Sequence, residues 1–409
     1  MTTESGKRVV IFIESNTTGT GRLFVRAARK VGFKAVLFAA NPKLYPFAEE
    51  EAVPIIEIDT QDEQKIIAAC AAIAGENVIS GIVSTSDHYL VLAARLARRF
   101  GLPGPSVEAV MACRIKTLQY RALSDAGVPI PASVAAETVR DAVTAARTIR
   151  LPVVLKPEQG TGSVGVKLCQ SVPQVAAHAH FLLAQHTNER GLPVPPAIIV
   201  QEFVEGPEYS IEAIGTKVIG ITRKHLGSQP HFVETGHDYP AILPDKAAAA
   251  MVNATTMALG ALDLRWGAAH VELRWASDGP RIIEVNPRLA GGFIPELIRV
   301  ASGIDIITEL MRCVIGQEPR TQPTAMQFAA IRFIIPRRSG RLESVTGVEE
   351  AAQSETVIAA EVYRPTGSEI RLHGDFRDRI GHIMGCGKDP GVVAQRVEIA
   401  LSTIKVEIQ

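Results

Sequence analysis

Four polar side chains that suit phosphate chemistry lie close together in the second half of the sequence. They are Glu272, Glu284, Asn286 and Arg288. Apolar alternation around them and turn residues at 277–280 predict a hairpin of two strands, which brings Glu272 near Glu284. Because alternate residues of a strand project from one face, Asn286 joins Glu284 there. Two carboxylates and an amide oxygen form a hard oxygen site that suits Mg²⁺ bridging phosphates.

Arg288 continues the same strand face and supplies a fixed cation for a phosphoryl or acyl-phosphate group. Gly291 and Gly292 lead into an apolar, helix-like pattern at residues 293–300, where free backbone amides predict an anion site. An ordinary hairpin with solvated charges is the alternative. The grouping of acids, amide and cation before a Gly-Gly helix start favours a functional site.

Lys156 ends an apolar strand predicted at residues 151–157 and precedes a glycine-rich turn. The turn contains Gly160, Thr161, Gly162, Ser163 and Gly165. Its backbone amides can wrap phosphate oxygens, while the Lys156 ammonium can meet the α and β phosphates. The pattern is not a P-loop, which requires Gly-Lys-Ser/Thr opening a helix. A mobile surface hairpin is the alternative.

Two further stretches place polar residues where a ligand could lie. Residues 197–212 predict two strands around a Gly-Pro turn; the first could open its main chain to an adenine edge, and an acid after the turn could take ribose hydroxyls. Residues 222–240 are polar and predict an irregular loop that contains Glu234 and His237. His237 is either a structural histidine or a substrate contact, and the histidines of this loop lack zinc spacing.

The first part of the chain predicts a parallel sheet covered by helices on both faces. A helix at residues 19–32 would pack inward through Leu23, Ala27 and Val31. The Gly-x-Gly after the first strand lacks the full dinucleotide fingerprint and predicts a tight turn. Short apolar strands are expected at residues 9–13, 35–39, 55–58 and 81–85.

The chain between this sheet and the glycine-rich turn contains two ambiguous segments. Residues 84–88 end the fourth strand, where open α/β sheets bind ligands, but they suit the N-cap of a helix at 89–100 equally well. Residues 106–126 predict one helix carrying Lys116, which by itself would be a solvated charge. Prolines at 128–131 break that helix and mark a lobe boundary.

Length, charge and cysteine content exclude several classes of protein. A chain of 409 residues suggests about two to four domains. Its 43 Lys plus Arg balance 43 Asp plus Glu, so no overall field favours nucleic acid or an anionic membrane. No apolar run reaches the length of a transmembrane helix, and the N-terminus does not suggest a signal peptide. The five scattered cysteines lack metal-ligand spacing and are expected as reduced thiols of a cytoplasmic protein.

Taken together, these motifs resemble the ATP-grasp carboxylate–amine ligases over nearly the whole chain. Residues 232–237 and 284–292 are most similar to bacterial L-amino acid ligases, which join two unprotected amino acids into a dipeptide. Gln201 departs from relatives that carry Glu and receives no role. The segments that match in order and spacing are Lys116, Lys156, 160–165, 201–208, Glu272, Glu284, Asn286 and Arg288.

The resemblance implies a role for each matched residue. ATP would be the nucleotide, with two Mg²⁺ ions that Mn²⁺ could replace. Arg288 and Lys156 would act in catalysis. The residues implied to bind ATP are Lys116, Lys156, Gly160, Gly162, Ser163 and Gly165 at the phosphates, the backbone of Glu202 and Val204 at adenine, and Glu208 at ribose. The implied metal ligands are Glu272, Glu284 and Asn286, and the implied substrate residues are Glu234, His237, Gly291 and Gly292.

The resemblance also implies an α/β ATP-grasp fold. It would comprise an N-terminal parallel-sheet lobe at residues 1–112, a helical linker at 113–129, a small B lobe at 130–212, and a central and C-terminal α+β lobe at 213–409. The enzyme would activate a carboxylate as an acyl phosphate and join it to an amine, releasing ADP and phosphate. Amino acids are the expected substrates, without nucleic acid or membrane, and a homodimer is the base-rate expectation.

Three alternatives stay open from the sequence. The first is another ATP-grasp enzyme that acts on a carboxylate in nucleotide, cofactor or natural-product synthesis, or on bicarbonate. The second is a non-catalytic ATP-binding protein, which the complete set of acids and arginine disfavours. The third is a nicotinamide-dependent oxidoreductase, which the missing fingerprint disfavours.

Overall fold

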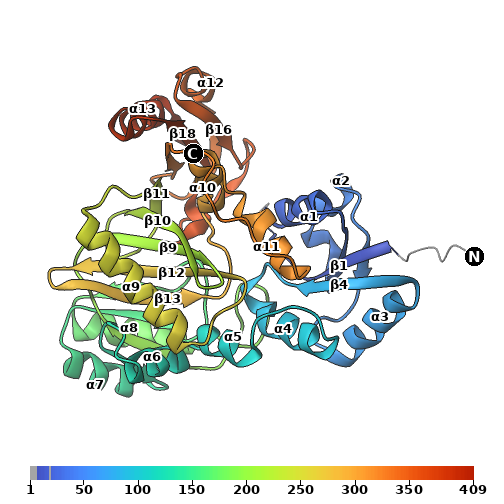
Figure 1. Ribbon diagram of the computed structural model, residues 1–409. Helices are drawn as coiled ribbons and strands as arrows, with labels where there is room; N and C mark the ends of the chain where they lie inside the picture. The colour runs from blue at the N-terminus through green and yellow to red at the C-terminus, as the bar shows by residue number, and fades with distance from the viewer. Residues whose placement is uncertain (1–6, 18–19) are drawn as a thin grey trace, which may run out of the picture.

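The first lobe of the computed structural model, which describes residues 7–17 and 20–409, is a parallel sheet in the order β3-β2-β1-β4 (Figure 1). Alternate residues of β1 enter two apolar cores: Val10 and Phe12 enter one, and Val9 and Ile11 the other. Both faces of the sheet are therefore covered, as predicted. The strands are β1 (Lys7–Ile13), β2 (Lys34–Ala39), β3 (Ile55–Glu57) and β4 (Asn77–Val83).

Helices of the first lobe pack on this sheet as expected, and two of the three residues predicted for the inner face of α1 pack inward, Ala27 and Val31. Leu23 is wrong, because it is 37% exposed, whereas Phe24 is buried in its place. The buried stripe therefore begins one residue later than predicted. Thr18 and Gly19 of the predicted turn lie outside the described residues. The helices are α1 (Thr20–Lys30), α2 (Phe47–Glu50), α3 (Glu63–Glu76) and α4 (Leu90–Arg99), with 3-10 turns η1 (Pro42–Leu44) and η2 (Asp87–Tyr89).

Two helices, rather than the single one predicted at 106–126, lead out of the first lobe. Helix α5 (Val107–Arg114) is separated from α6 (Lys116–Asp125) by Ile115, whose extended backbone has φ −104° and ψ 103°. The break makes Lys116 the first residue of α6. Its side chain is therefore turned inward, and the residue is 4% exposed rather than solvated.

A small antiparallel sheet in the order β5-β8-β6-β7 follows. Two helices pack on it through small residues such as Ala142, Ala146 and Ala179. Strand β9 (Glu208–Ile214), whose first residues lie inside the predicted B lobe, pairs with strands of the large sheet described next. The elements are β5 (Ser133–Ala136), α7 (Val139–Ile149), β6 (Val153–Pro157), β7 (Lys167–Cys169), α8 (Val172–Leu183) and β8 (Ile198–Glu202).

The large sheet has the order β13-β12-β9-β10-β11-β14-β18-β16. The predicted irregular loop at 222–240 is wrong, because most of it forms β10 and β11. Alternating polar residues on these strands face other polar groups, so the segment lacks an obvious strand pattern. The strands are β9 (Glu208–Ile214), β10 (Lys217–Leu226), β11 (Glu234–Tyr239), β12 (Ala268–Ala276), β13 (Gly279–Asn286), β14 (Phe328–Ile334), β16 (Val357–Val362) and β18 (Gly381–Gly387).

The predicted hairpin around Glu272 and Glu284 is confirmed as β12 and β13, with its turn at 277–278. Helix α9 (Asp245–Ala261) covers the apolar face of these strands through Met251 and Ala258. The C-terminal part, at the top of Figure 1, carries a second small sheet in the order β17-β15-β19. The remaining elements of residues 294–409 are α10 (Ile294–Ser302), α11 (Ile306–Val314), β15 (Gly340–Thr346), α12 (Val348–Ala352), β17 (Glu369–Ile370), η3 (Phe376–Asp378), α13 (Pro390–Thr403) and β19 (Lys405–Ile408).

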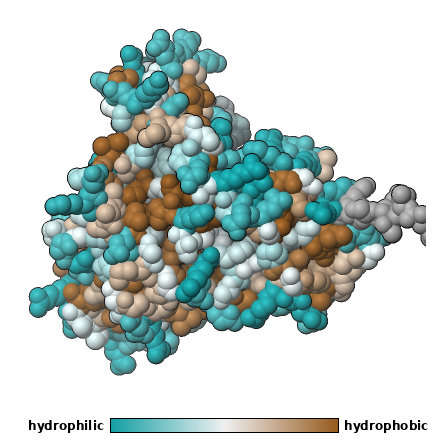
Figure 2. Space-filling view, viewed as in Figure 1, coloured by the Kyte–Doolittle hydropathy of each residue, from teal (hydrophilic) through white to brown (hydrophobic). Residues whose placement is uncertain are grey.

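The face of the molecule in Figure 2 mixes hydrophilic and hydrophobic residues, and the hydrophobic ones gather in several small groups. Across residues 7–17 and 20–409, no helix combines the length and apolar character needed to cross a membrane. All five cysteines are free thiols, as predicted.

Candidate active site

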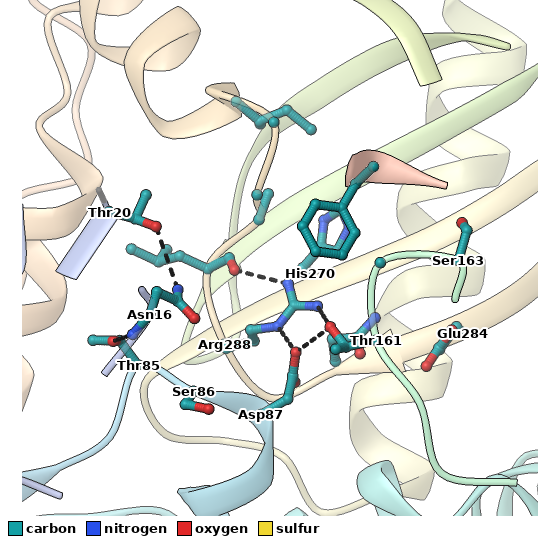
Figure 3. A pocket seen from close by; sticks show the side chains of 18 of the residues that line it. Asn16, Thr20, Thr85, Ser86, Asp87, Thr161, Ser163, His270, Glu284 and Arg288 are labelled. Atoms are coloured by element: carbon teal, nitrogen blue, oxygen red, sulfur yellow. Dashed lines mark hydrogen bonds and ion pairs between the residues drawn. The ribbon is translucent and has the colours of Figure 1, made fainter. Parts of the chain in front are cut away.

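A cavity of about 1080 Å³ lies where the lobes meet and takes residues from each of them (Figure 3). Of the predicted site residues, Gly165 and His237 do not line it. Gly165 has φ +74° and serves the turn of the loop itself, where its carbonyl oxygen meets His178 Nε2 at 2.9 Å. The predicted residues that do line the cavity are Lys116, Lys156, Gly160, Gly162, Ser163, Glu202, Val204, Glu208, Glu234, Glu272, Glu284, Asn286, Arg288, Gly291 and Gly292.

One face of the large sheet is polar across adjacent strands at the cavity. Glu272 on β12 is in register with Glu284 on β13 and with Ser210 on β9. The opposite face of the same strands carries Val271 and Val285, which belong to the apolar core. Period-two alternation therefore gathers the acids on one side. The remaining polar residues of this face are Glu208, Glu212, Thr222, Lys224, His270, Arg274 and Asn286.

Each of the two central carboxylates is held by a buried lysine. Lys116 Nζ lies 2.8 Å from Glu284 Oε1, and Lys224 Nζ lies 3.1 Å from Glu272 Oε2. Lys224 also lies 2.9 Å from Glu208 and 2.8 Å from Glu234. Burial alone would lower the pKa of Lys224, but the surrounding carboxylates outweigh it and raise that pKa well above its usual value. Lys224 is therefore the cation that balances three acids of the cavity.

His270, which lies two residues before Glu272 on β12, contacts the Glu272 carboxylate. Its Nε2 lies 3.1 Å from Glu272 Oε1, and its Nδ1 lies 2.7 Å from Glu212 Oε1. Burial disfavours the charged ring, but the Glu212 and Glu272 carboxylates outweigh it and raise the pKa of His270 to about 9. The protonated ring can then donate a hydrogen bond to each carboxylate.

Arg288 lies at the end of the polar strand face, as predicted, with its guanidinium at the cavity. Its Nε donates to Asp87 Oδ2 at 2.8 Å, and one terminal nitrogen donates to the Leu289 carbonyl at 3.0 Å. Asp87 belongs to the ambiguous segment 84–88. No side chain of Ser86 or Tyr89 caps the following helical turns, and residues 84–88 line the cavity. The ligand-facing interpretation of this segment therefore fits the geometry.

Lys156 is buried, and its side chain contacts Gln201, the residue that departs from the family pattern. Its Nζ donates to Gln201 Oε1 at 2.9 Å and lies 5.3 Å from the centre of the Tyr120 ring. Burial lowers the pKa of Lys156, and more distant acids, Glu284 first, only partly offset it. A neutral amide as direct partner leaves the lysine charge available for an anion in the cavity.

The glycine loop adopts a backbone that few residues tolerate. Gly162 has φ +60° and Ser163 has φ +62°. A Cβ at Gly162 would lie 2.5 Å from the Phe376 ring, which the C-terminal part places against the loop. The loop therefore needs glycine at 162 for both its backbone conformation and its close packing.

Some of the groups predicted to bind adenine and ribose already form hydrogen bonds within the protein. The Glu202 amide donates to the Ala132 carbonyl at 2.8 Å, and the Val204 carbonyl accepts from Arg274 at 2.9 Å. Glu208 accepts from Arg274 Nε at 3.0 Å as well as from Lys224. Arg274 thus fixes the turn between β8 and β9.

The predicted substrate residues separate into two groups. Glu234 lines the cavity and accepts from Lys224 and Arg379. His237 is fully buried behind it, with Nε2 3.1 Å from Glu234 and Nδ1 2.9 Å from the Gly292 carbonyl. In this conformation His237 orients the cavity wall instead of facing a substrate.

The anion site predicted at the start of α10 stays a prediction, and within it only the amides of residues 291–293 could serve. The amides of Ile294, Glu296 and Leu297 already donate to carbonyls of the same turn, and Pro295 has no amide hydrogen. Gly291 and Gly292 do line the cavity, and Gly292 needs its left-handed backbone because a Cβ would lie 2.4 Å from the His237 ring.

Several residues of the site carried no clear sequence signal. His270 and Arg274 lie at alternate positions of a strand whose other face is apolar, a pattern that could have located them. Lys224 has Arg223 and His225 as its neighbours along β10, so no such pattern marks it. Asp87 and Arg114 lie on turns and helices far from the main motif, and their proximity to it has no local signature.

Comparison with known proteins agrees with this geometry. The family model of the ATP-grasp domain matches residues 149–296, that of the ATP-grasp N-terminal domain matches 25–104, and that of L-amino acid ligase C-terminal domain 2 matches 332–409. Protein y4rH of Sinorhizobium fredii is 34% identical over 378 residues, which cover 92% of this chain and 78% of that protein. Human carnosine synthase 1 is 30% identical over 333 residues, covering 75% of this chain but only 40% of that protein.

A solved structure shares the whole fold. The L-amino acid ligase from Bacillus licheniformis superposes with a TM-score of 0.81 at 21% sequence identity, covering 100% of both chains. The chain belongs to the ATP-grasp superfamily of carboxylate–amine ligases. Within that superfamily, residues 332–409 match the C-terminal domain model of the L-amino acid ligases. The predicted α/β ATP-grasp fold is confirmed.

Proposed function

We propose that this enzyme joins two L-amino acids into a dipeptide, with conversion of ATP to ADP and phosphate. The observation that carries the proposal is the polar sheet face, where Glu272, Glu284, Asn286 and Arg288 lie at one cavity with the glycine loop. The match of residues 332–409 to the L-amino acid ligase domain supports amino acids as substrates. The names of the carnosine synthase and L-amino acid ligase relatives are consistent with dipeptide formation.

ATP would lie between the small sheet and the polar face of the large sheet. Lys116, Lys156 and the loop of Gly160, Gly162, Ser163 and Gly165 would hold its phosphates. Val204 would offer its amide to adenine, while Glu202, whose own amide is engaged, would have only its carbonyl to offer. Glu208 would bind ribose with the lone pairs that Lys224 and Arg274 leave available.

Mg²⁺ fits the donor set at Glu272, Glu284 and Asn286, because all three offer hard oxygen ligands on one sheet face. Among the residues that the structure describes, no three His, Cys, Asp or Glu side chains form a metal cluster. Substrate phosphates would therefore complete the coordination, as is usual for Mg²⁺. When bound, one or two Mg²⁺ ions would neutralise charge on the β and γ phosphates.

The chemistry would proceed in two steps. The carboxylate of the first amino acid attacks the γ-phosphorus, which gives an acyl phosphate and ADP. The free amine of the second then attacks the acyl carbon, expels phosphate and loses a proton. Arg288 would bind the phosphoryl oxygens during transfer, and closure of the glycine loop would exclude water from the acyl phosphate.

Substrate contacts are proposed at Glu234, Gly291 and Gly292, with His237 holding Glu234 in place. The carboxylate of Glu234 suits an ammonium group. A homodimer and a cytoplasmic location stay predictions.

A screen for ADP release with pairs of the common L-amino acids, combined with mass detection of products, tests the proposal. Dipeptide formed in proportion to ADP is the expected result. ADP release that needs bicarbonate or a non-amino carboxylate, without a dipeptide for any pair, would instead assign the enzyme to another branch of the ATP-grasp ligases.

A further inference from the structure

We infer that Asp87 is a positioning residue that joins the closed glycine loop to Arg288. The inference rests on the proposed role of Arg288 in phosphoryl transfer. Asp87 is the first residue of η2, at the carboxyl end of β4 in the first lobe. Neither the polar sheet face nor the glycine loop includes it, yet its carboxylate contacts a residue from each.

The carboxylate of Asp87 receives three hydrogen bonds from three different parts of the chain. Its Oδ2 accepts from Arg288 Nε at 2.8 Å and from Thr161 Oγ1 at 2.6 Å, and both of these bonds are drawn in Figure 3. Its Oδ1 accepts from Arg114 at 3.0 Å. The side chain of Asp87 is only 6% exposed. The first lobe, the glycine loop and the end of β13 therefore converge on one buried group.

The charges around Asp87 keep it ionised. Burial alone would raise its pKa, but the guanidinium groups of Arg288 and Arg114, together with the Thr161 hydroxyl, outweigh burial and hold the pKa below its usual value. An ionised acceptor makes these hydrogen bonds shorter and stronger than neutral ones. The ionised Asp87 therefore holds Arg288, Arg114 and Thr161 in a fixed arrangement at the closed cavity.

Asp87 fixes the orientation of the Arg288 guanidinium. It accepts from Nε, and the Leu289 carbonyl accepts from one terminal nitrogen, so the rear of the planar group is held. N–H groups of the two terminal nitrogens are left for the cavity. A bidentate contact with a phosphoryl group requires this plane to be fixed, since two N–H groups must point at two oxygens together.

The Asp87 carboxylate also makes a contact that depends on closure of the glycine loop. Thr161 lies between Gly160 and Gly162, and its hydroxyl can reach Asp87 only while the loop lies over the cavity. Arg288 also lies 3.5 Å from the Thr161 hydroxyl. Opening of the loop removes Thr161 from both partners, which leaves Arg288 less firmly oriented. Phosphoryl transfer is thereby coupled to the closed state, in which water is excluded.

A double-mutant cycle on the full-length enzyme tests this coupling. Thr161→Val removes the loop contact alone, and Asp87→Asn removes the charge with little change of shape. Each variant should lower kcat by about tenfold or more and leave the KM for ATP within about threefold. The double variant should be no slower than Asp87→Asn alone, because the two changes break one linked set of contacts.

Two exposed substitutions of the same type serve as controls. The Thr144 hydroxyl bonds only within helix α7, to the Arg140 carbonyl, and Asp278 lies in the β12–β13 turn. Thr144→Val and Asp278→Asn should leave kcat unchanged. Multiplicative losses in the double variant, or a lower melting temperature with normal kcat per folded enzyme, would show that Asp87 is only a structural tie between lobes and overturn the inference.

Hydrogen exchange separates this inference from the proposed reaction. A non-hydrolysable ATP analogue with Mg²⁺ should slow amide exchange at residues 158–167 in the native enzyme, and this slowing should be lost in Thr161→Val and Asp87→Asn. The measurement needs nucleotide binding but no amino acids. Unchanged protection in both variants overturns the inference whatever the activity. If both variants lose this protection but the native enzyme forms no dipeptide, the loop contact is supported and the proposed function is contradicted.

Discussion

Lys224 on β10 reaches past β9 to Glu272 on β12, with 3.1 Å between Nζ and Oε2. The residue of β9 in register with Glu272 is Ser210, which is small enough to leave room for this contact. The lysine binds Glu208 and Glu234 as well, so a single buried cation balances acids from three strands. This arrangement explains how the fold tolerates a concentration of negative charge at the cavity.

Replacement of Lys224 by Met should destabilise the protein by about 3 kcal/mol, because three neighbouring carboxylates lose the buried cation between them. Arg274, Arg379 and His270 stay beside them, so the loss should lie at the lower end for a broken buried ion pair. Lys224 holds the folded-state pKa of Glu272 below its ordinary value near 4.5. The difference in stability between the native protein and Lys224→Met should therefore be largest above that pH and should decrease as the pH falls below it. Thermal melts of native protein and variant across this range measure the difference.

Lys217→Met, at the exposed start of the same strand, is the control and should melt like the native protein. An unchanged melting temperature for Lys224→Met at neutral pH would contradict the balancing role.

Glu284→Gln should lower kcat by roughly a hundredfold, the loss typical when one charged stabilising group is removed from an active site. The amide keeps the shape of the side chain but removes the charge that balances the buried Lys116, so the melting temperature should fall and kcat is compared per folded enzyme. Steady-state kinetics at saturating Mg²⁺ measures the effect, with exposed Glu137→Gln as control. Near-normal turnover of Glu284→Gln would count against its place among the metal ligands.

Arg288→Lys should lower kcat by about tenfold or more, because an ammonium cannot bind an oxyanion with two parallel N–H groups. The KM for ATP should change little if Lys116, Lys156 and the loop carry nucleotide binding. A raised KM with constant kcat would mean that Arg288 is a ground-state ATP ligand. Arg281→Lys, on strand β13 that precedes Arg288, is the matched control and should behave like the native enzyme.

Gly162→Ala should slow turnover through two separate effects. An L-residue at φ +60° is strained by about 1–2 kcal/mol, and the new Cβ would press on Phe376. Gly32→Ala, at φ +89° with no atom within 4 Å, carries only the backbone strain and should lower stability without lowering kcat. Adding Phe376→Ala to Gly162→Ala should restore part of the turnover. No recovery in that double variant would mean that crowding at the ring is unimportant.

His270 should contribute a pH-dependent part of the stability. Its folded pKa of about 9 lies above its ordinary value of 6.5, so the contribution is complete below 6.5 and is lost as pH rises through 9. Melting temperatures of native protein and His270→Gln, measured in EDTA, should therefore differ most in the acid half of this window. A difference that is constant across the window would mean that the ring stays neutral.

The hairpin and the glycine loop were predictable because their signals are local. Strand alternation and turn residues depend on the backbone period, which places Glu272 opposite Glu284 in any folded hairpin of that register. The glycines at 162 and 165 likewise reflect backbone angles that other residues resist. The class of chemistry therefore followed from residues close together in the chain.

The partners of those residues were decided by tertiary packing. Ile115 breaks a helix that propensity alone would continue, and this turns Lys116 toward Glu284, 168 residues away in sequence. Asp87 meets Arg288 across 201 residues. Neither contact has a local pattern, because the energy that stabilises a buried ion pair comes from the surroundings into which both side chains fold. The sequence by itself determined the kind of site, and only the folded chain determined which charges hold it in place.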